Sequence, residues 1–528
     1  MRRPHRWSWL LLLPVALHVT VSPAQADSLV LHARSRVEGT PGSGRFQVVE
    51  KAQEWDPRKT AVVICDMWDR HWCQGASARV AEMAPRMNEV VSAARRQGVF
   101  IIHCPSDTLK FYEGTPQRRL AQAAPKVAPR NWASLDRARE GALPIDDSDG
   151  GCDDSPRCQE GAPWTRQIAT LRIEAEDAIT DSAEIYGLMD QRGIENVLIM
   201  GVHLNMCVLG RPFGIRQLVQ QGKNVVLVRD LTDTMYNSRK RPFVSHFAGT
   251  DLMIAHVERY WCPTITSVDL AGGEPFRFQA DRRPNLVFLI GEDEYRTAET
   301  LPEFAQRELE PRGFRVEIIQ DGPGDKGNFA GLTEALPRAD GLLVSLRRRA
   351  LPRAQLDAIR AHLEAGKPLV GIRTASHAFA PRDQERDEFV VKGGRAEWPR
   401  FDPEVLGGNY QGHHGTGPRV TVRPAPGAED HAILSGVDLA SFSTLGSLYR
   451  VSPLAGSATP LVIGSVPGKP EEPVTWVHAY GPKQARVFYT SLGHPDDFAQ
   501  PTFRRLLLNG VVWVLNPPDA QRQGEPSP

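Results

Sequence analysis

The sequence predicts two α/β domains in series, each a doubly wound, mainly parallel sheet of the Rossmann-like kind. Apolar runs of strand length alternate with stretches of helical spacing, which is the pattern of a parallel sheet covered by helices on both faces. A segment rich in glycine, proline and charge, AGGEPFRFQADRRPN, then interrupts the chain, and the same alternation begins again after it. We therefore place one domain at 27–270, a linker at 271–283 and a second domain at 284–517.

The length and composition fit this architecture. A chain of 528 residues has room for about three domains or two large ones. Hydrophobic residues make up 41% and charged residues 24%, which excludes a disordered or fibrous chain. Lys+Arg and Asp+Glu are both 63, so no net field attracts nucleic acid or an anionic membrane. We expect the protein to act on a small molecule and to bind neither nucleic acid nor a membrane. The composition is also compatible with a homo-oligomer.

The first 26 residues have the pattern of a secretory signal peptide. Arginines at 2, 3 and 6 precede an apolar run from about residue 7 to 21, and Ala24-Gln25-Ala26 has the form of a cleavage site. An uncleaved membrane anchor is the alternative, but a bilayer span needs about 20 apolar residues. The sequence thus predicts a secreted or periplasmic protein without a membrane segment after cleavage.

In the first half, the run TAVVICD predicts a strand that ends at Asp66. Apolar residues at helical spacing predict a helix over 79–97, and further apolar runs predict strands at 99–103, 196–202 and 224–228. The polar insert from about 104 to 170 is expected to form loops over one sheet edge.

In the second half, apolar runs predict strands at 285–290, 314–319, 339–345 and 367–373, with a helix at about 298–312 after the first of them. Four short strands follow in quick succession, RVTV, TPLVIGS, VTWVHAY and ARVFYTS, and a last helix covers about 501–515. The polar, proline-rich tail at 518–528 is expected to be disordered.

Two residues of the first half have the position and chemistry of a catalytic pair. Active residues of parallel sheets lie at the carboxyl ends of strands, where Asp66 and Cys207 are expected. A helix start stabilises a thiolate, and a nearby carboxylate can accept the thiol proton. The alternative is that Cys207 is a small buried hydrophobic residue, as most free cysteines are.

The motifs CDMWD at 65–69 and GVHLNMCVLGRPFGIRQLVQQGKNVVLVRD at 201–230 resemble the isochorismatase-like cysteine hydrolases, which include nicotinamidases and related amidases. The resemblance covers about 55–265. It implies hydrolysis of a small amide or related C–N bond through a Cys207 thioester, with Asp66 as base and acid. It also implies that the amides of His203 and Cys207 bind the oxyanion, beside a cis Val202–His203 peptide.

The chain departs from the family motif at two places. Leu204 stands where the family has threonine three residues before the cysteine. The stretch LRIEAEDAITDSAEIYGLM, where the family places its lysine, contains none. Lys110 or Arg172 are candidates for the missing cation. Without one, the domain either has an altered mechanism or binds without turnover.

Asp69 and His71 form a D-x-H pair next to Asp66, and with His203 and Leu204 they are expected near the pocket. Some relatives use a D-x-H pair for metal, but too few converging ligands lie nearby. We therefore expect a structural role for the pair, and no metal or cofactor. A disulfide between Cys152 and Cys158 is expected, because both lie in one short polar loop of an exported chain.

The second domain resembles the trehalose-utilisation (ThuA-like) domains of the class I glutamine amidotransferase-like superfamily. VGIRTASHAF (370–379), VLGGNYQGHHG (405–415) and VFYTSLGHPDDF (487–498) carry this resemblance. Arg373 stands where amidotransferases have their nucleophilic cysteine, so no glutaminase is expected. His494 and Asp496 resemble the other end of the amidotransferase triad.

A pocket in the second domain is predicted from its histidines. His377, His413 and His414 are candidates to line it together with Arg373, His494 and Asp496, although loop histidines that support backbone turns would give the same pattern. Three hypotheses follow: a cysteine hydrolase with a ThuA-like accessory domain, a binding protein for sugars or other small molecules with degenerate sites, and catalysis in the second domain alone.

Overall fold

The computed structural model describes residues 28–38, 42, 46–130, 139–322, 324–384, 386 and 394–515. The predicted signal peptide at 1–26 and the predicted tail at 518–528 lie outside these residues. Within the described part, no helix has the length and apolar character needed to cross a membrane.

The first domain is built on an eight-stranded sheet with the order β2-β1-β8-β7-β6-β3-β4-β5. The six strands from β8 to β5 are parallel, and the β1–β2 hairpin adds two antiparallel strands at the edge. The strands are β1 (Leu29–Glu38), β2 (Phe46–Trp55), β3 (Thr60–Cys65), β4 (Phe100–Cys104), β5 (Ala178–Ile179), β6 (Asn196–Val202), β7 (Asn224–Asp233) and β8 (Thr264–Ile265).

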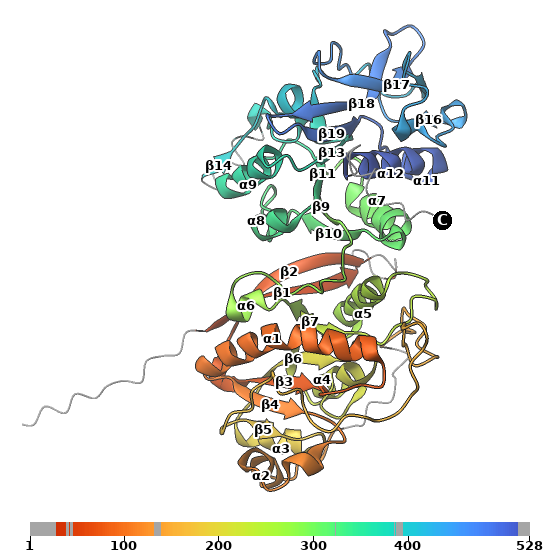
Figure 1. Ribbon diagram of the computed structural model, residues 1–528. Helices are drawn as coiled ribbons and strands as arrows, with labels where there is room; N and C mark the ends of the chain where they lie inside the picture. Colours follow the sequence, from red (N-terminus) through yellow and green to blue (C-terminus); the bar gives the residue numbers. More distant parts are fainter. Residues whose placement is uncertain are drawn as a thin grey trace, which may run out of the picture.

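Helices cover both faces of this sheet because its central strands are apolar throughout (Figure 1). On β3, Val62 and Ile64 pack against α1, whereas Val63 packs on the opposite face in the core that includes α3, α4 and α5. The helices are α1 (Gln74–Arg96), α2 (Pro116–Gln122), α3 (Glu184–Gln191), α4 (Ile215–Gln220), α5 (His246–Tyr260) and α6 (Val268–Ala271). Two cores on opposite faces of one parallel sheet confirm the doubly wound prediction.

The predicted loop insert contains a helix that was not expected from the sequence. Helix α2 begins with Thr115 as its N-cap, whose side chain accepts the backbone N–H of Arg118, and with Pro116 in its first turn. Both are ordinary helix-start signals. From 139 to 177 the chain has no helix or strand, as expected for loops.

The second domain contains a nine-stranded sheet with the order β10-β9-β11-β13-β19-β18-β17-β15-β16. The five strands from β10 to β19 are parallel, and the remaining pairs are antiparallel. The strands are β9 (Asn285–Gly291), β10 (Arg315–Gln320), β11 (Gly341–Leu346), β13 (Leu369–Ile372), β15 (Val420–Pro424), β16 (Ser443–Thr444), β17 (Thr459–Ser465), β18 (Glu472–Tyr480) and β19 (Ala485–Thr490). A separate pair joins β12 (Leu351–Pro352) and β14 (Arg395–Ala396).

Helices again cover both faces of the second sheet. On β9, Phe288 packs in the core with α7 and α12, and its neighbours Val287 and Leu289 pack in the core with α8 and α9. The helices are α7 (Thr297–Phe304), α8 (Leu332–Ala335), α9 (Arg353–Glu364), α11 (Pro495–Ala499) and α12 (Pro501–Leu515). The predicted fold class, two α/β domains in series, is therefore confirmed.

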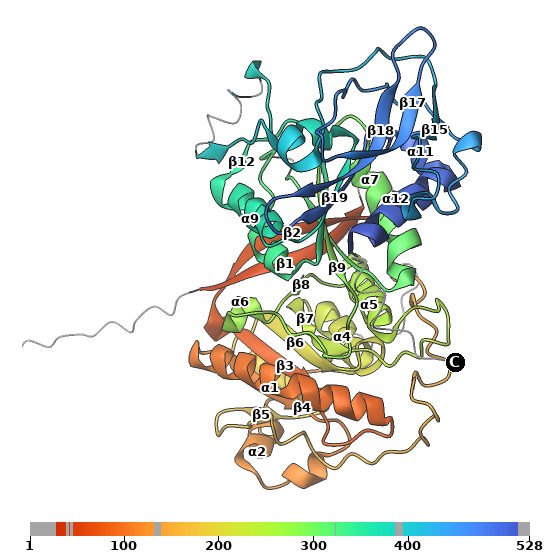
Figure 2. The ribbon, with the colours of Figure 1, turned by 45° about the horizontal axis from the view of Figure 1, so that its top comes forward.

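The segment between the two sheets packs on the first domain. Phe278 is buried in the α1 core, the backbone N–H of Phe276 donates to Asp230, and that of Gln279 donates to Glu82 on α1. The β1–β2 hairpin lies on the side of the first sheet that faces the second domain (Figures 1 and 2). The segment predicted as a linker is thus largely an extension of the first domain.

Gly201, near the end of β6, allows β6 to approach β3 closely. Its φ is +114°, and a Cβ atom at this position would lie 2.0 Å from the carbonyl oxygen of Cys65. We predict that Gly201→Ala lowers the free energy of unfolding by at least about 2 kcal/mol, because both strain and overpacking follow. Gly161→Ala is the control, since its Cβ would meet no atom within 4 Å. Equal melting temperatures for the two variants in thermal unfolding would contradict this role of Gly201.

Candidate active site

Asp66 and Cys207 meet at the carboxyl edge of the first sheet. Strands β3 and β6 are parallel neighbours with Cys65 opposite Gly201, so both residues emerge at the same edge. Asp66 follows β3 directly with a φ of +47°, a conformation that is uncommon for residues other than glycine and recurs at functional sites. Cys207 lies in the turn Leu204–Val208 after β6, and the Val202–His203 peptide is cis, as expected.

The Asp66 carboxyl group is fully buried and its pKa is high for an acid. Its Oδ1 accepts the backbone N–H of Ser106 at 2.8 Å. Burial raises its pKa from 3.8 to about 6, although the contacts with Cys207, Ser106 and Arg211 act in the opposite direction. The carboxyl group is therefore largely ionised at neutral pH, and its pKa is close to that of an effective general base.

The Cys207 thiol is partly exposed and protonated at rest. Burial, and then the charge of Asp66, raise its pKa to about 12, while Arg211 lowers it. The position of Cys207 at the start of a helical turn is therefore not sufficient to deprotonate its thiol in the free protein. Because Asp66 contacts the thiol, it can accept the thiol proton when Cys207 attacks a substrate.

The cation of this site is Arg211, which was not among the cations expected from the sequence. Its Nε lies 3.7 Å from Asp66 Oδ2, and its side chain also interacts with the Cys207 sulfur. The backbone N–H of Arg211 donates to the Cys207 carbonyl, so one turn places both side chains. Lys110 and Arg172 are exposed, and neither is among the groups with the largest effects on the pKa of Asp66 or Cys207. The feature of the sequence that indicates this cation is the arginine four residues after Cys207.

His203 and His71 pack together beside this turn. Their rings meet edge to face with centroids 5.0 Å apart, and burial lowers their pKa values to about 3 and about 4. Both are therefore neutral at pH 7. His71 Nδ1 accepts the backbone N–H of Cys73 at 3.1 Å, which is the structural role predicted for it. His203 Nε2 is buried without a hydrogen-bond partner among the described residues. Leu204 is fully buried in the core.

Asp69 organises the loop that lies over this edge. It accepts the backbone N–H and the hydroxyl of Thr165 at 2.9 and 2.6 Å and the backbone N–H of Arg166 at 3.3 Å. The neighbouring Trp164 stacks on Trp68 with ring centroids 4.5 Å apart. Asp69 therefore positions the loop and does not contact the reacting pair.

The predicted disulfide between Cys152 and Cys158 is wrong for this structure, in which both thiols are free. The Asp154 carboxylate contacts both sulfurs, with Oδ2 at 3.7 Å from Cys152 and 3.1 Å from Cys158. Cys152 is buried next to Cys73, whereas Cys158 is partly exposed near the backbone N–H of Gln74. The sequence shows that Cys152 and Cys158 are close along the chain, but it does not show that Cys73 lies beside them.

Arg373 occupies an elbow in the second domain that has the geometry of a nucleophile position. It follows β13 with a φ of +44° and is almost fully buried. Its guanidinium donates to the Ser491 carbonyl at 2.5 Å and to the hydroxyls of Tyr295 and Ser447 at 3.2 Å each. It also lies over the Tyr295 and Tyr449 rings at 4.3 and 4.6 Å. The elbow is thus filled by a fixed cation.

Tyr295 and Tyr449 separate Arg373 from a cavity of about 520 Å³, which they line together with His377 and His413. The other lining residues are mostly polar: Glu294, Arg347, Arg348, Ser376, Ala380, Arg382, Pro399, Asp402, Pro403, Asn409, Tyr410, Gln411 and Gly412. His377 stacks on Tyr410 with centroids 4.4 Å apart, and its Nδ1 lies 3.1 Å from the hydroxyl of Ser376.

The remaining candidates of the second domain lie elsewhere. His494 is the N-cap of α11, where its Nδ1 accepts the backbone N–H of Asp496, and the Asp496 carboxylate is mostly exposed. His414 faces Glu472 at 3.5 Å. Among the described residues, none of these three lines the cavity. The expected grouping of five histidine and aspartate side chains in one pocket is therefore correct only for His377 and His413.

We predict no glutaminase activity from the second domain, because Arg373 replaces the nucleophile and His494 is engaged as a helix cap. The assay measures ammonia release from glutamine by the full chain carrying Cys207→Ala, which removes any contribution of the first domain. Adding Arg373→Cys is not expected to create activity, since the base would still be absent. Ammonia release by the Cys207→Ala protein would contradict this assignment.

Known proteins are similar to different parts of this chain. Residues 286–514, under half of the chain, match the family model described as ThuA, trehalose utilisation. A putative ThuA-like protein structure from Parabacteroides merdae is 17% identical, with 44% of this chain and 90% of that chain covered and a TM-score of 0.34. No curated protein matches this chain.

Other similar structures cover the first half. A cysteine hydrolase from Pseudomonas syringae pv. phaseolicola is 16% identical, with 41% of this chain and 93% of that chain covered and a TM-score of 0.27. An isochorismatase family protein from Burkholderia thailandensis is 14% identical, with 40% and 94% covered and a TM-score of 0.25. The chain thus joins a domain that matches the trehalose-utilisation (ThuA) family to an α/β domain that is similar to isochorismatase-family and cysteine hydrolase structures.

Proposed function

We propose that the first domain is an exported, isochorismatase-like cysteine hydrolase that cleaves a small amide or related C–N bond. The observation that carries this proposal is the contact of Asp66, Cys207 and Arg211 at one sheet edge. Arg211 supplies the cation that the family motif requires and the expected position lacks. The secretory pattern at 1–26 supports action outside the cytoplasm.

In the proposed reaction, Cys207 Sγ attacks the substrate carbonyl carbon while its proton passes to Asp66. The backbone amides of His203 and Cys207 hold the oxyanion. The C–N bond then breaks, the amine leaves with the proton from Asp66, and a thioester remains on Cys207. Asp66 next takes a proton from water, whose oxygen attacks the thioester; the C–S bond then breaks, the acid leaves, and Asp66 returns its proton to the Cys207 sulfur, which restores the thiol and the ionised base.

Arg211 has two effects that suit this sequence of steps. Its charge lowers the pKa of Asp66, which keeps the base ionised, and it lowers the pKa of Cys207, which favours sulfur as it becomes anionic. Asp66 raises the pKa of Cys207, so the free enzyme holds a thiol that is protected from oxidation.

A second candidate function belongs to the second domain, which we propose binds a small polar molecule such as a sugar or polyol. The observation that favours it is the cavity of about 520 Å³ with tyrosine, arginine and amide side chains on its wall. Thiol alkylation separates the two functions: it should abolish hydrolysis in a panel of small amides and leave ligand binding by the second domain unchanged.

We predict that kcat/KM decreases tenfold for each pH unit below a pH of about 6, because Asp66 must be ionised to act as the base. Arg211→Gln removes a charge that lowers the pKa of Asp66, so the acidic limb should move to higher pH. The measurement is kcat/KM from pH 4.5 to 9 on the best amide of the panel. Arg172→Gln, at an exposed arginine that is not among the groups with the largest effects on the pKa of Asp66, is the control and should leave the limb in place. If the acidic limb of the pH profile does not move in Arg211→Gln, the guanidinium does not control the pKa of Asp66.

We also predict opposite effects of two variants on alkylation of Cys207. Asp66→Asn should accelerate labelling at pH 8, because a charge that raises the thiol pKa is gone, and Arg211→Gln should slow it. Wild-type labelling should be slow at neutral pH and increase with alkali. Site-resolved mass spectrometry gives the rate for Cys207, and Cys158, which is also partly exposed, serves as the internal reference. Changes of the same sign in both variants would show that charge does not control this thiol.

A further inference from the structure

Three cysteines and one carboxylate converge at the start of α1, away from the Asp66–Cys207 pair. Cys73 is the N-cap of α1, and Cys152, Asp154 and Cys158 come from the irregular segment that follows residue 139. The ligand atoms of Cys73, Cys152 and Asp154 all lie within 4.8 Å of one another. Cys158 joins this group through Asp154.

The oxygen–sulfur distances are those expected between ligands of one tetrahedral metal ion. Asp154 Oδ2 lies 3.4 Å from Cys73 Sγ, 3.7 Å from Cys152 Sγ and 3.1 Å from Cys158 Sγ. With metal–sulfur bonds of about 2.3 Å and metal–oxygen bonds of about 2.0 Å, sulfur and oxygen ligands of one zinc ion are about 3.5 Å apart. One carboxylate oxygen thus stands at nearly that separation from three sulfurs.

The charges around the cluster favour a cation over a disulfide. A disulfide needs two sulfurs and gains nothing from a carboxylate, whereas here one carboxylate oxygen lies beside all three sulfurs, and its negative charge attracts a cation. Thiolate ligands in a tetrahedral arrangement select zinc among the common divalent ions.

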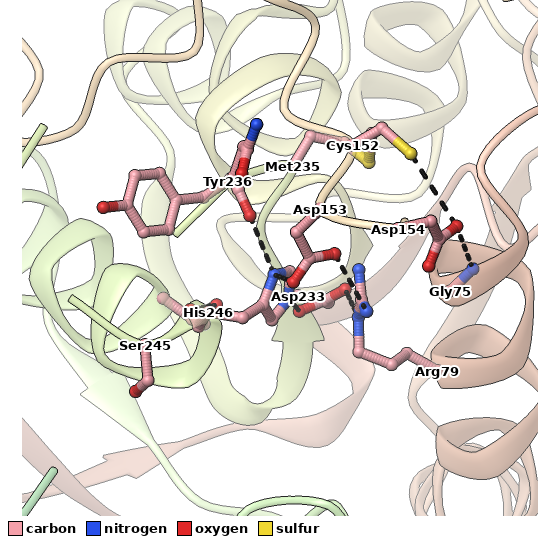
Figure 3. Close-up of polar contacts among 12 residues, drawn as sticks. Gly75, Arg79, Cys152, Asp153, Asp154, Asp233, Met235, Tyr236, Ser245 and His246 are labelled. Atoms are coloured by element: carbon pink, nitrogen blue, oxygen red, sulfur yellow. Dashed lines mark hydrogen bonds and ion pairs between the residues drawn. The ribbon is translucent and has the colours of Figure 1, made fainter. Parts of the chain in front are cut away.

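Neighbouring groups fix the position of Asp154 and compensate the negative charge. The backbone N–H of Gly75, in the first turn of α1, donates to Asp154 Oδ2 at 2.9 Å (Figure 3). The adjacent Asp153 pairs with His246 at 3.4 Å and with Arg79 at 3.8 Å, and Arg79 also binds Asp233 at 2.7 Å. The helix start and Arg79 place positive charge next to the cluster.

We propose that Cys73, Cys152, Cys158 and Asp154 form a structural zinc site that fastens the 139–177 segment to α1. Zinc binding releases the three thiol protons and involves no change of oxidation state. Residues of the same segment contact the Cys207 turn, since Asn205 Nδ2 donates to Asp147 at 2.7 Å. The site therefore secures the loop that lies against the nucleophile.

The test measures metal content and affinity on the full chain without an affinity tag. The wild-type protein should contain about one zinc per chain by elemental analysis, and after chelation it should regain zinc in a titration against a chromophoric chelator. Cys158→Ala, at the partly exposed position, should weaken zinc binding at least tenfold and remain folded by circular dichroism. Cys262→Ala, a buried cysteine in a different core, is the matched control and should bind zinc as the wild type does.

Cobalt substitution gives a second readout that does not depend on stability. Cobalt should give thiolate charge-transfer absorption in the wild type, weaker absorption in Cys158→Ala and none in Cys152→Ala. Asp154→Asn should keep the charge-transfer bands and lower the affinity. A protein with a Cys73–Cys152 or Cys152–Cys158 disulfide by peptide mapping and no zinc would overturn the proposal, as would reduced protein that takes up neither metal.

Discussion

The pairing of β3 with β6 is the constraint on which the candidate active site depends. Gly201 lets these strands approach so closely that the carbonyl of Cys65 occupies the space of a side chain. The chain then leaves both strands at one edge, with Asp66 at a positive φ on one side and the Cys207 turn on the other. The electrostatic coupling between the two groups follows from this proximity, since a carboxylate and a thiol a few ångströms further apart would titrate almost independently.

The two domains present the same backbone device with opposite chemistry. In each, the residue after a central parallel strand adopts a left-handed conformation, Asp66 in the first domain and Arg373 in the second. The first elbow holds an acid that faces a thiol and a cation. The second holds a guanidinium whose hydrogen bonds are made to two hydroxyls and two carbonyls, so it supports a cavity wall. One geometry thus places an acid beside a thiol in one domain and a packed cation in the other.

Much of the fold could be predicted from sequence, because buried parallel strands are continuous apolar runs and their ends are marked by polar residues. This signal located both sheets and placed Asp66 and Cys207 together. The β1–β2 hairpin was not identified, since its alternating, charged strands lack such a run. Arg211 was not predicted because the family motif places its lysine on another element, and a guanidinium from elsewhere in the chain can fill the same space.

The cysteine cluster shows the limit of local reasoning. Cys152 and Cys158 are near in sequence, but Cys73 comes from a helix start that only the tertiary fold brings to them. The grouping of second-domain histidines failed for the same reason. His494 lies in a motif that resembles the end of the amidotransferase triad, yet its ring caps its own helix. No pattern in the sequence distinguishes a histidine that caps a helix from one that lines a pocket.

The packing of Phe276 and Phe278 determines where the chain can be divided. These rings pack against the α1 core and against each other, with centroids 4.9 Å apart, although they lie beyond the last strand of the first sheet. A first domain excised at the last residue of α6 would lose this aromatic cover and expose an apolar patch on α1, a typical cause of aggregation. The residues that pack on the first domain therefore extend to about residue 283, where Arg283 pairs with Asp281 and Asp251.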